Sequence, residues 1–169
     1  MDASLLKSVQ TPLKDKYRSD PQAALVTLRA QGRAAGLSCK VETGKALVEA
    51  GLHPATGGDG IAACSGDMLL EALVACAGVT CRAVATSIGI ELQDVRVVAE
   101  GDLDFRGTLG VSKEVPVGFS KIRLSFELDT DATEEQKATL LRLTERYCVV
   151  LQTLRSPTDV TARITGGPE

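Results

Sequence analysis

The sequence lacks tryptophan and is poor in other aromatic residues, with three phenylalanines and two tyrosines among 169 residues. Aromatic platforms of the kind that stack on single-stranded nucleic acid are therefore nearly absent. Clustered positive charge is missing as well, because the net charge is -3, the pI is about 5.3, and no basic run exceeds two residues. A nucleic-acid partner is therefore not expected. The hydrophobic core has to be built from Leu, Val, Ile and Ala.

Long hydrophobic runs are also missing. The first ten residues, MDASLLKSVQ, lack the charged and then apolar pattern of an export signal. The longest uncharged apolar stretch, Ala72–Cys81, is about half of what a bilayer crossing needs. We therefore expect a soluble, cytoplasmic protein with no membrane partner. In that reducing compartment the five cysteines are expected to be buried residues, reactive thiols or metal ligands rather than structural disulfides.

The motifs that hold metals and phosphates are absent from the sequence too. There is no CxxC pair and a single histidine, so a zinc site would need Cys39, Cys64, Cys81 and His53 at unsuitable spacings. The glycine-rich run at residues 57–60 belongs to no phosphate-binding pattern and predicts a loop. No GxSxG motif is present either. We expect no metal and no bound cofactor.

The first third of the chain predicts a helix followed by strands. Residues 1–20 are helical and mostly polar in pattern, with Thr11 and Pro12 as a helix start and Pro21 as its stop. Three short alternating runs follow, separated by glycines, and predict antiparallel strands: LVTLRAQGR, LSCKVET and KALVEAGL. Residues 53–66 are irregular.

The remainder predicts two long helices and three further strands. A helix over Asp67–Ile88, capped by Ser65 or Asp67 and ended by Gly89, is apolar enough to be buried on most of its surface. Alternating strands cover residues 92–106 and 115–129. A capping box at Thr133 opens a helix to about Leu154, and VTARIT predicts a last strand. This order predicts one α+β domain over residues 1–169, with a helical segment at 1–20, a core at 21–165 and a mainly antiparallel sheet.

Two cysteines lie within the predicted helices. Cys76 lies within LVACAGVTC and Cys148 within ERYCVVL, each expected in the middle of its helix. They are either small buried core residues or reactive thiols. No nearby helix N-terminus is expected to lower either pKa, so a reactive thiol would need a cation supplied by the fold.

Several segments together resemble the OsmC family, which includes organic hydroperoxide resistance proteins. They are SGDMLLEALVACAGVT, TEEQKATLLRL, TERYCVVLQTL and the N-terminal TPLKDKYRSDPQAALVTLRAQGR. The likeness runs from about residue 12 to 165. It implies an intertwined homodimer, in which antiparallel sheet wraps two central helices, and a thiol peroxidase for organic hydroperoxides. By matched position Cys76 would be the peroxidatic thiol and Cys148 the resolving one, with an external dithiol reductant, for example of the lipoyl type.

The sequence departs from the family pattern at the activating residues. One branch has a glutamate ten residues before the reactive cysteine, where this chain has Gly66. Asp67 either replaces that acid, as in a related branch, or caps the helix. The family's arginine is matched first by Arg33 and second by Arg29, while the acid Glu49 has no matched role.

Three functions remain in competition at this stage. The first is a Cys76/Cys148 peroxidase, whose thiols should approach each other although 72 residues separate them. The second is a non-catalytic OsmC-like stress protein that binds an apolar ligand. The third is another thiol function, such as dithiol or acyl handling.

Overall fold

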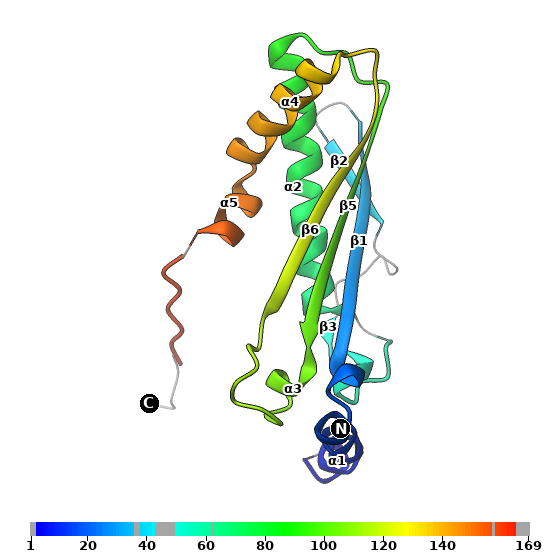
Figure 1. Cartoon of the computed structure of the whole chain (residues 1–169), viewed down its shortest axis with the longest axis vertical. Helices are drawn as coiled ribbons and strands as arrows, with labels where there is room; N and C mark the ends of the chain where they lie inside the picture. Colours follow the sequence, from blue (N-terminus) through cyan, green and yellow to red (C-terminus); the bar gives the residue numbers. More distant parts are fainter. Residues whose placement is uncertain (1–2, 36–37, 43–49, 62, 157, 165–169) are drawn as a thin grey trace, which may run out of the picture.

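The main sheet has four antiparallel strands in the order β2–β1–β5–β6, and the long helix α2 lies along it (Figure 1). This computed structural model describes residues 3–35, 38–42, 50–61, 63–156 and 158–164, without the side chains of residues 3–7 and 28–50. The four strands are β1 (Leu25–Ala35), β2 (Ser38–Glu42), β5 (Asp94–Asp104) and β6 (Phe119–Asp129). The expected α+β fold with a mainly antiparallel sheet is confirmed.

The remaining elements lie at the ends of this sheet and beside α2. A small parallel pair joins β3 (Ala50–Gly51) to β4 (Ala63–Cys64). The helices are α1 (Ala3–Ser19), η1 (Pro21–Ala24), η2 (Pro54–Thr56), α2 (Ser65–Ile88), α3 (Phe105–Thr108), α4 (Glu134–Tyr147) and α5 (Val149–Arg155). Helices α4 and α5 both pack against α2, which places residues 134–155 beside the central helix.

Helix α2 buries one stripe of its surface against the sheet. The stripe recurs every three or four residues and consists of Leu70, Leu73, Val74, Ala77, Gly78, Cys81, Val84 and Ala85. Among the described helices, only α2 is long and apolar enough to cross a membrane. The buried core helix of a globular protein meets the same two criteria. The expectation of burial on most sides is wrong for the single chain, since Leu69 is 39% exposed and Ile88 41%. One face of α2 is therefore left uncovered.

The helical segment expected at residues 1–20 is confirmed as α1, but the helix start expected at Thr11 and Pro12 is wrong. Helix α1 begins at Ala3, and Pro12 lies inside it rather than at its first turn. A proline there removes one helical hydrogen bond, and contacts with the rest of the chain compensate. Tyr17 is buried and donates its hydroxyl to the Ala55 carbonyl at 2.7 Å, and Gln10 donates to the Thr56 carbonyl at 3.2 Å. These bonds hold α1 against the loop that precedes α2.

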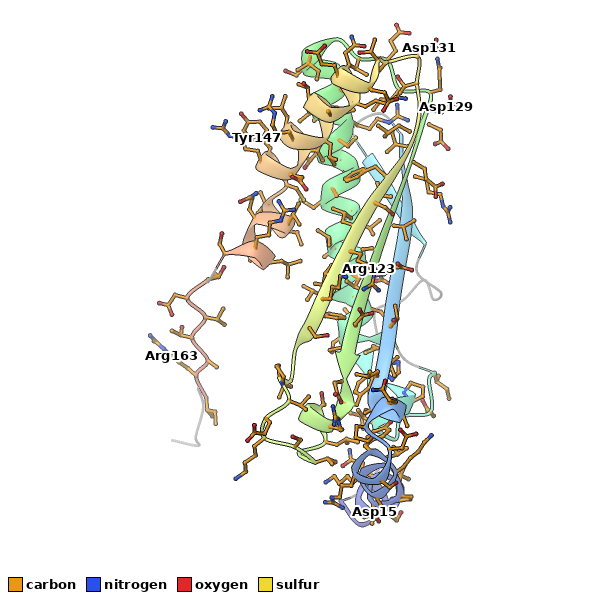
Figure 2. All side chains as sticks on the ribbon, viewed as in Figure 1. Asp15, Arg123, Asp129, Asp131, Tyr147 and Arg163 are labelled. Atoms are coloured by element: carbon orange, nitrogen blue, oxygen red, sulfur yellow. The ribbon has the colours of Figure 1, made fainter. Side chains whose placement is uncertain are left out.

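The sheet face turned away from α2 carries charged pairs. Arg123 (labelled in Figure 2) donates to Asp102 at 2.8 Å, and Thr27 donates to the same carboxylate at 2.8 Å. These bonds hold the pKa of Asp102 well below its usual range. Arg96 pairs with Glu127 at 3.1 Å. This face therefore has the polar character of a solvent surface, and the chemistry has to be sought on the side of α2.

Two expectations about strands are not met in the described residues. Of the predicted strand KALVEAGL, residues 45–49 lie outside the described part, and Ala50–Gly51 pair in parallel with β4 rather than antiparallel. The described part of VTARIT, residues 160–164, forms no strand. Val160 is 82% and Ile164 100% exposed, and the segment extends away from the sheet (Figures 1 and 2, Arg163). A strand needs a neighbour to pair with, and no described strand of this chain pairs with that segment.

The helix ends were predicted with mixed success. Gly89 ends α2 in the left-handed conformation at φ 74°, and the Thr133–Gln136 capping box opens α4, both as expected. The prediction that Ser65 or Asp67 caps α2 is wrong. The N-cap is Cys64, without a side-chain cap bond, because β4 leads directly into the helix and Ser65 already belongs to its first turn.

Candidate active site

Cys76 and Cys148 come together where α2 meets the junction of α4 and α5. Cys76 lies half-buried in the middle of α2, and Cys148 is fully buried. Each thiol shifts the pKa of the other through a hydrogen-bond interaction, and both are free rather than joined in a disulfide. The fold therefore brings into contact the two cysteines that the sequence singled out.

The helix expected to run through Cys148 is interrupted there. Cys148 adopts φ -71° and ψ 104°, an extended conformation that ends α4 at Tyr147 and lets α5 begin at Val149. Two helical hydrogen bonds remain on either side of the interruption. The Cys148 N–H donates to the Thr144 carbonyl, and the Gln152 N–H donates to the Cys148 carbonyl, each at 2.9 Å. The expectation that Cys148 lies mid-helix is wrong, and the first N–H groups of α5 become available to other acceptors.

Two of these N–H groups, those of Val149 and Val150, act on the Cys76 thiol. Burial acts most strongly on this thiol and by itself would raise its pKa. Four hydrogen-bond donors act in the opposite sense, in decreasing order the Val150 N–H, the Cys148 thiol, the Thr80 hydroxyl and the Val149 N–H. The net result is a Cys76 pKa below the usual value for cysteine. The expectation that no local group lowers this pKa is therefore wrong.

Cys148 titrates in the opposite direction. Burial is the main cause that raises its pKa, and the neighbouring Cys76 thiol adds to the rise, while the N–H groups of Leu151 and Val150 partly oppose it. Cys148 therefore stays protonated and donates its S–H, while Cys76 is the sulfur that ionises first. The site thus pairs one thiol of lowered pKa with one thiol of raised pKa.

The arginines expected to activate Cys76 lie on β1. Arg33 is in register with Lys40 of β2 and Arg96 of β5, and Arg29 is in register with Glu100. Their side chains, like those of Cys39 and Glu49, are outside the described part of the chain. Activation by Arg33 or Arg29 stays a prediction.

Asp67 is not brought to the thiols within this chain. It lies in the first turn of α2, nine residues before Cys76, which is about 13.5 Å along the helix and about half a turn around it. Burial raises the pKa of Asp67, and the nearby His53 partly offsets the rise. His53 itself stacks on Phe105 with ring centroids 4.9 Å apart. Asp67 belongs to the base of α2 rather than to the surroundings of Cys76.

The other described cysteines are separate from this pair. Cys64 lines a cavity of about 370 Å³ near the start of α2, together with His53 and Phe105. Cys81 is buried, and burial raises the pKa of its thiol despite a contact with the Thr144 hydroxyl. Among the described residues no three His, Cys, Asp or Glu side chains form a metal-binding group. Among the described residues, the candidate reactive groups of the site are thiols.

Sequence reasoning missed the donors around Cys76. Thr80 lies one turn after Cys76 on the same face of α2, a relation that the i, i+4 spacing alone could have shown. The interruption at Cys148 had a weaker signal in Val149 and Val150, since β-branched residues are poorer helix formers than Leu or Ala. Nothing in the sequence showed that their N–H groups would face another helix.

The fold and the site together define an α+β protein in which a thiol on the central helix α2 meets a second thiol at the junction of α4 and α5. The model of the family described as OsmC-like protein matches residues 57–163, and the chain belongs to that family. A solved structure of an OsmC-like hydroperoxide resistance protein from Jannaschia sp. CCS1 is similar, with 21% identity and a TM-score of 0.61. The similarity covers 86% of this chain and 97% of that one. No curated protein matches the sequence.

Proposed function

We propose that this protein is a thiol peroxidase that reduces organic hydroperoxides as part of a defence against peroxide stress. The observation that carries the proposal is the contact between Cys76 and Cys148, with the pKa of one thiol lowered and that of the other raised. Membership of the OsmC family and the likeness to a hydroperoxide resistance protein support the same class of substrate.

The reaction follows from the two protonation states. The Cys76 thiolate attacks one oxygen of the hydroperoxide, the O–O bond breaks, and the leaving alkoxide takes a proton to become an alcohol. Cys76 is then a sulfenic acid. The Cys148 sulfur attacks it, a disulfide forms and water leaves, with the S–H proton accounted for in that water. An external dithiol returns both cysteines to thiols by exchange, and supplies the two electrons of the cycle.

The decisive experiment measures hydroperoxide consumption at steady state. Cumene and t-butyl hydroperoxide are supplied with dithiothreitol or dihydrolipoamide to the wild type, to Cys76→Ser and to Cys64→Ser as a matched control. We expect Cys76→Ser to abolish turnover and Cys64→Ser to retain it. One equivalent of hydroperoxide should also remove two free thiols per chain. Equal residual rates in all three proteins would refute the proposal.

We further propose that the working protein is a homodimer. Part of α2 is uncovered in the single chain, and the extended segment after α5 exposes Val160 and Ile164. A second copy would cover apolar surface of this kind, and an obligate dimer should bury more than ~2,000 Å² in total. Sedimentation at micromolar concentration tests this proposal, and a folded monomer would contradict it. The expected place of action is the cytoplasm.

A non-catalytic function as an apolar ligand carrier is the second candidate. One observation favours it: a cavity of about 510 Å³ between β6 and α4, lined mainly by apolar side chains such as Leu124, Phe126 and Leu141. In that case Cys76 and Cys148 would be core residues. The hydroperoxide assay separates the two functions, because a carrier would bind a hydroperoxide without consuming it.

A further inference from the structure

The side chain of Gln152 bridges the interruption between α4 and α5. Its Nε2 donates to the backbone carbonyl of Glu145 at 2.7 Å, seven residues earlier. Since a carbonyl oxygen can only accept, the amide must present its nitrogen here. In an uninterrupted helix the Glu145 carbonyl would instead accept the N–H of Val149, four residues later. Gln152 therefore takes the place of the backbone donor that the interruption removes.

The removed donor is one of those that act on the reactive sulfur. Hydrogen bonding from the Val150 N–H, and less strongly from the Val149 N–H, lowers the pKa of Cys76, and both groups start the helix that packs against α2. A given N–H cannot serve both its helical carbonyl and this sulfur with good geometry. Closure of the helix across Cys148 would thus withdraw these donors from Cys76.

We propose that Gln152 is a positioning residue for Cys76: by occupying the Glu145 carbonyl it keeps the helix interrupted and the Val149 and Val150 N–H groups directed at the sulfur. The residue is on the exposed side of α5 and does not act on the thiol itself. The inference rests on the proposed function only in assigning a catalytic benefit to the lowered pKa.

A second side-chain bond spans the same junction. Arg155 donates to the Glu145 carboxylate at 2.9 Å, but both side chains are more than one-third exposed. Exposed ion pairs of this kind contribute little. The Gln152 bond differs because it satisfies a backbone acceptor that the interruption leaves open. It is the contact to test first.

The test replaces Gln152 with methionine, which has a similar shape and helix propensity but no donor. The pKa of Cys76 is obtained from its alkylation rate against pH, followed by peptide mapping, and hydroperoxide reduction is measured in parallel. An exposed hydrogen bond changes an equilibrium by about 2- to 10-fold, so we expect the Cys76 pKa to rise by about 0.3 to 1 unit. Thr153, which is also exposed on α5, provides the control: Thr153→Ser should leave the Cys76 pKa unchanged.

A double variant tests whether Gln152 acts through the interruption. Proline at position 149 fits the first position of a helix and favours an extended residue before it, which is the conformation of Cys148. Val149→Pro therefore fixes the interruption, at the cost of one donor to Cys76. In this background Gln152→Met should produce no further rise in the Cys76 pKa.

The outcomes separate this inference from the proposed function. It is overturned if Gln152→Met, or Gln152→Leu should the first variant not fold, leaves the Cys76 pKa unchanged. An equal rise with and without Val149→Pro overturns it too, because Gln152 would then act independently of the interruption. A rise that Val149→Pro abolishes, in a protein that consumes no hydroperoxide, supports the positioning role and refutes the peroxidase function.

Discussion

The hydroxyl of Thr80 offers a sharp test of how Cys76 is activated. Hydrogen bonding from this hydroxyl, one turn further along α2, lowers the pKa of Cys76. Thr80→Val removes this donor and keeps the shape of the side chain. A hydrogen bond to a charged group contributes about 1.5–3 kcal/mol, and one pKa unit corresponds to about 1.4 kcal/mol, so a sole donor would change the pKa by about 1–2 units. Because Thr80 shares the sulfur with three other donors, we expect a rise of about 0.5–1 unit.

The assay is the rate of Cys76 alkylation against pH, followed by peptide mapping. In the wild type the rate should reach its plateau at a lower pH than for an ordinary cysteine, and in Thr80→Val the curve should move to higher pH. Thr86→Val is the matched control, because that hydroxyl donates at 2.9 Å to the Arg82 carbonyl on the same helix. The reasoning fails if both variants shift the curve equally, or if the wild-type pKa exceeds that of free cysteine.

Three further predictions address the partner thiol, the arginine and the fold. Cys148→Ser should leave Cys76 reactive but let its sulfenic acid accumulate, which a dimedone adduct of the expected mass would show. Arg33→Met should raise the alkylation pKa of Cys76 and slow hydroperoxide reduction without unfolding the protein, and an unchanged pKa would exclude this arginine. Tyr17→Phe should lower the free energy of unfolding by about 0.5–1.5 kcal/mol in urea, because a carbonyl acceptor loses its donor, whereas Tyr147→Phe at an exposed site should not.

The elements that the sequence predicted well are those with a local physical cause. The alternation in residues 92–106 and 115–129 became β5 and β6 because one face of each strand packs in the core. The Thr133 capping box and Gly89 act within a few residues of themselves, so they could be identified without the fold. The contact of Cys76 with Cys148 followed from family resemblance rather than from any local pattern.

The parts that could not be predicted depend on partners distant in sequence. Pro12 is tolerated inside α1 because Tyr17 and Gln10 bind the loop before α2, a contact that no pattern within residues 1–20 reveals. The segment VTARIT has the composition of a strand, but a strand forms only beside an edge that can receive it. The described residues of this segment have no such edge within the chain. The proposed dimer is relevant here because a second copy would bring a further sheet edge.

The interruption at Cys148 explains how one short backbone segment can take part in shifting the pKa values of two thiols in opposite directions. Its N–H groups reach both sulfurs, yet only Cys76 also receives a thiol and a hydroxyl donor, so negative charge is better stabilised there. Cys148 is fully buried, and its pKa is raised. In the proposed reaction it therefore stays protonated until Cys76 is oxidised. Oxidation of Cys76 removes its negative charge and with it one cause of the raised Cys148 pKa. If the proposed reaction is correct, Cys148 becomes a better nucleophile after Cys76 has reacted, which is the order that disulfide formation requires.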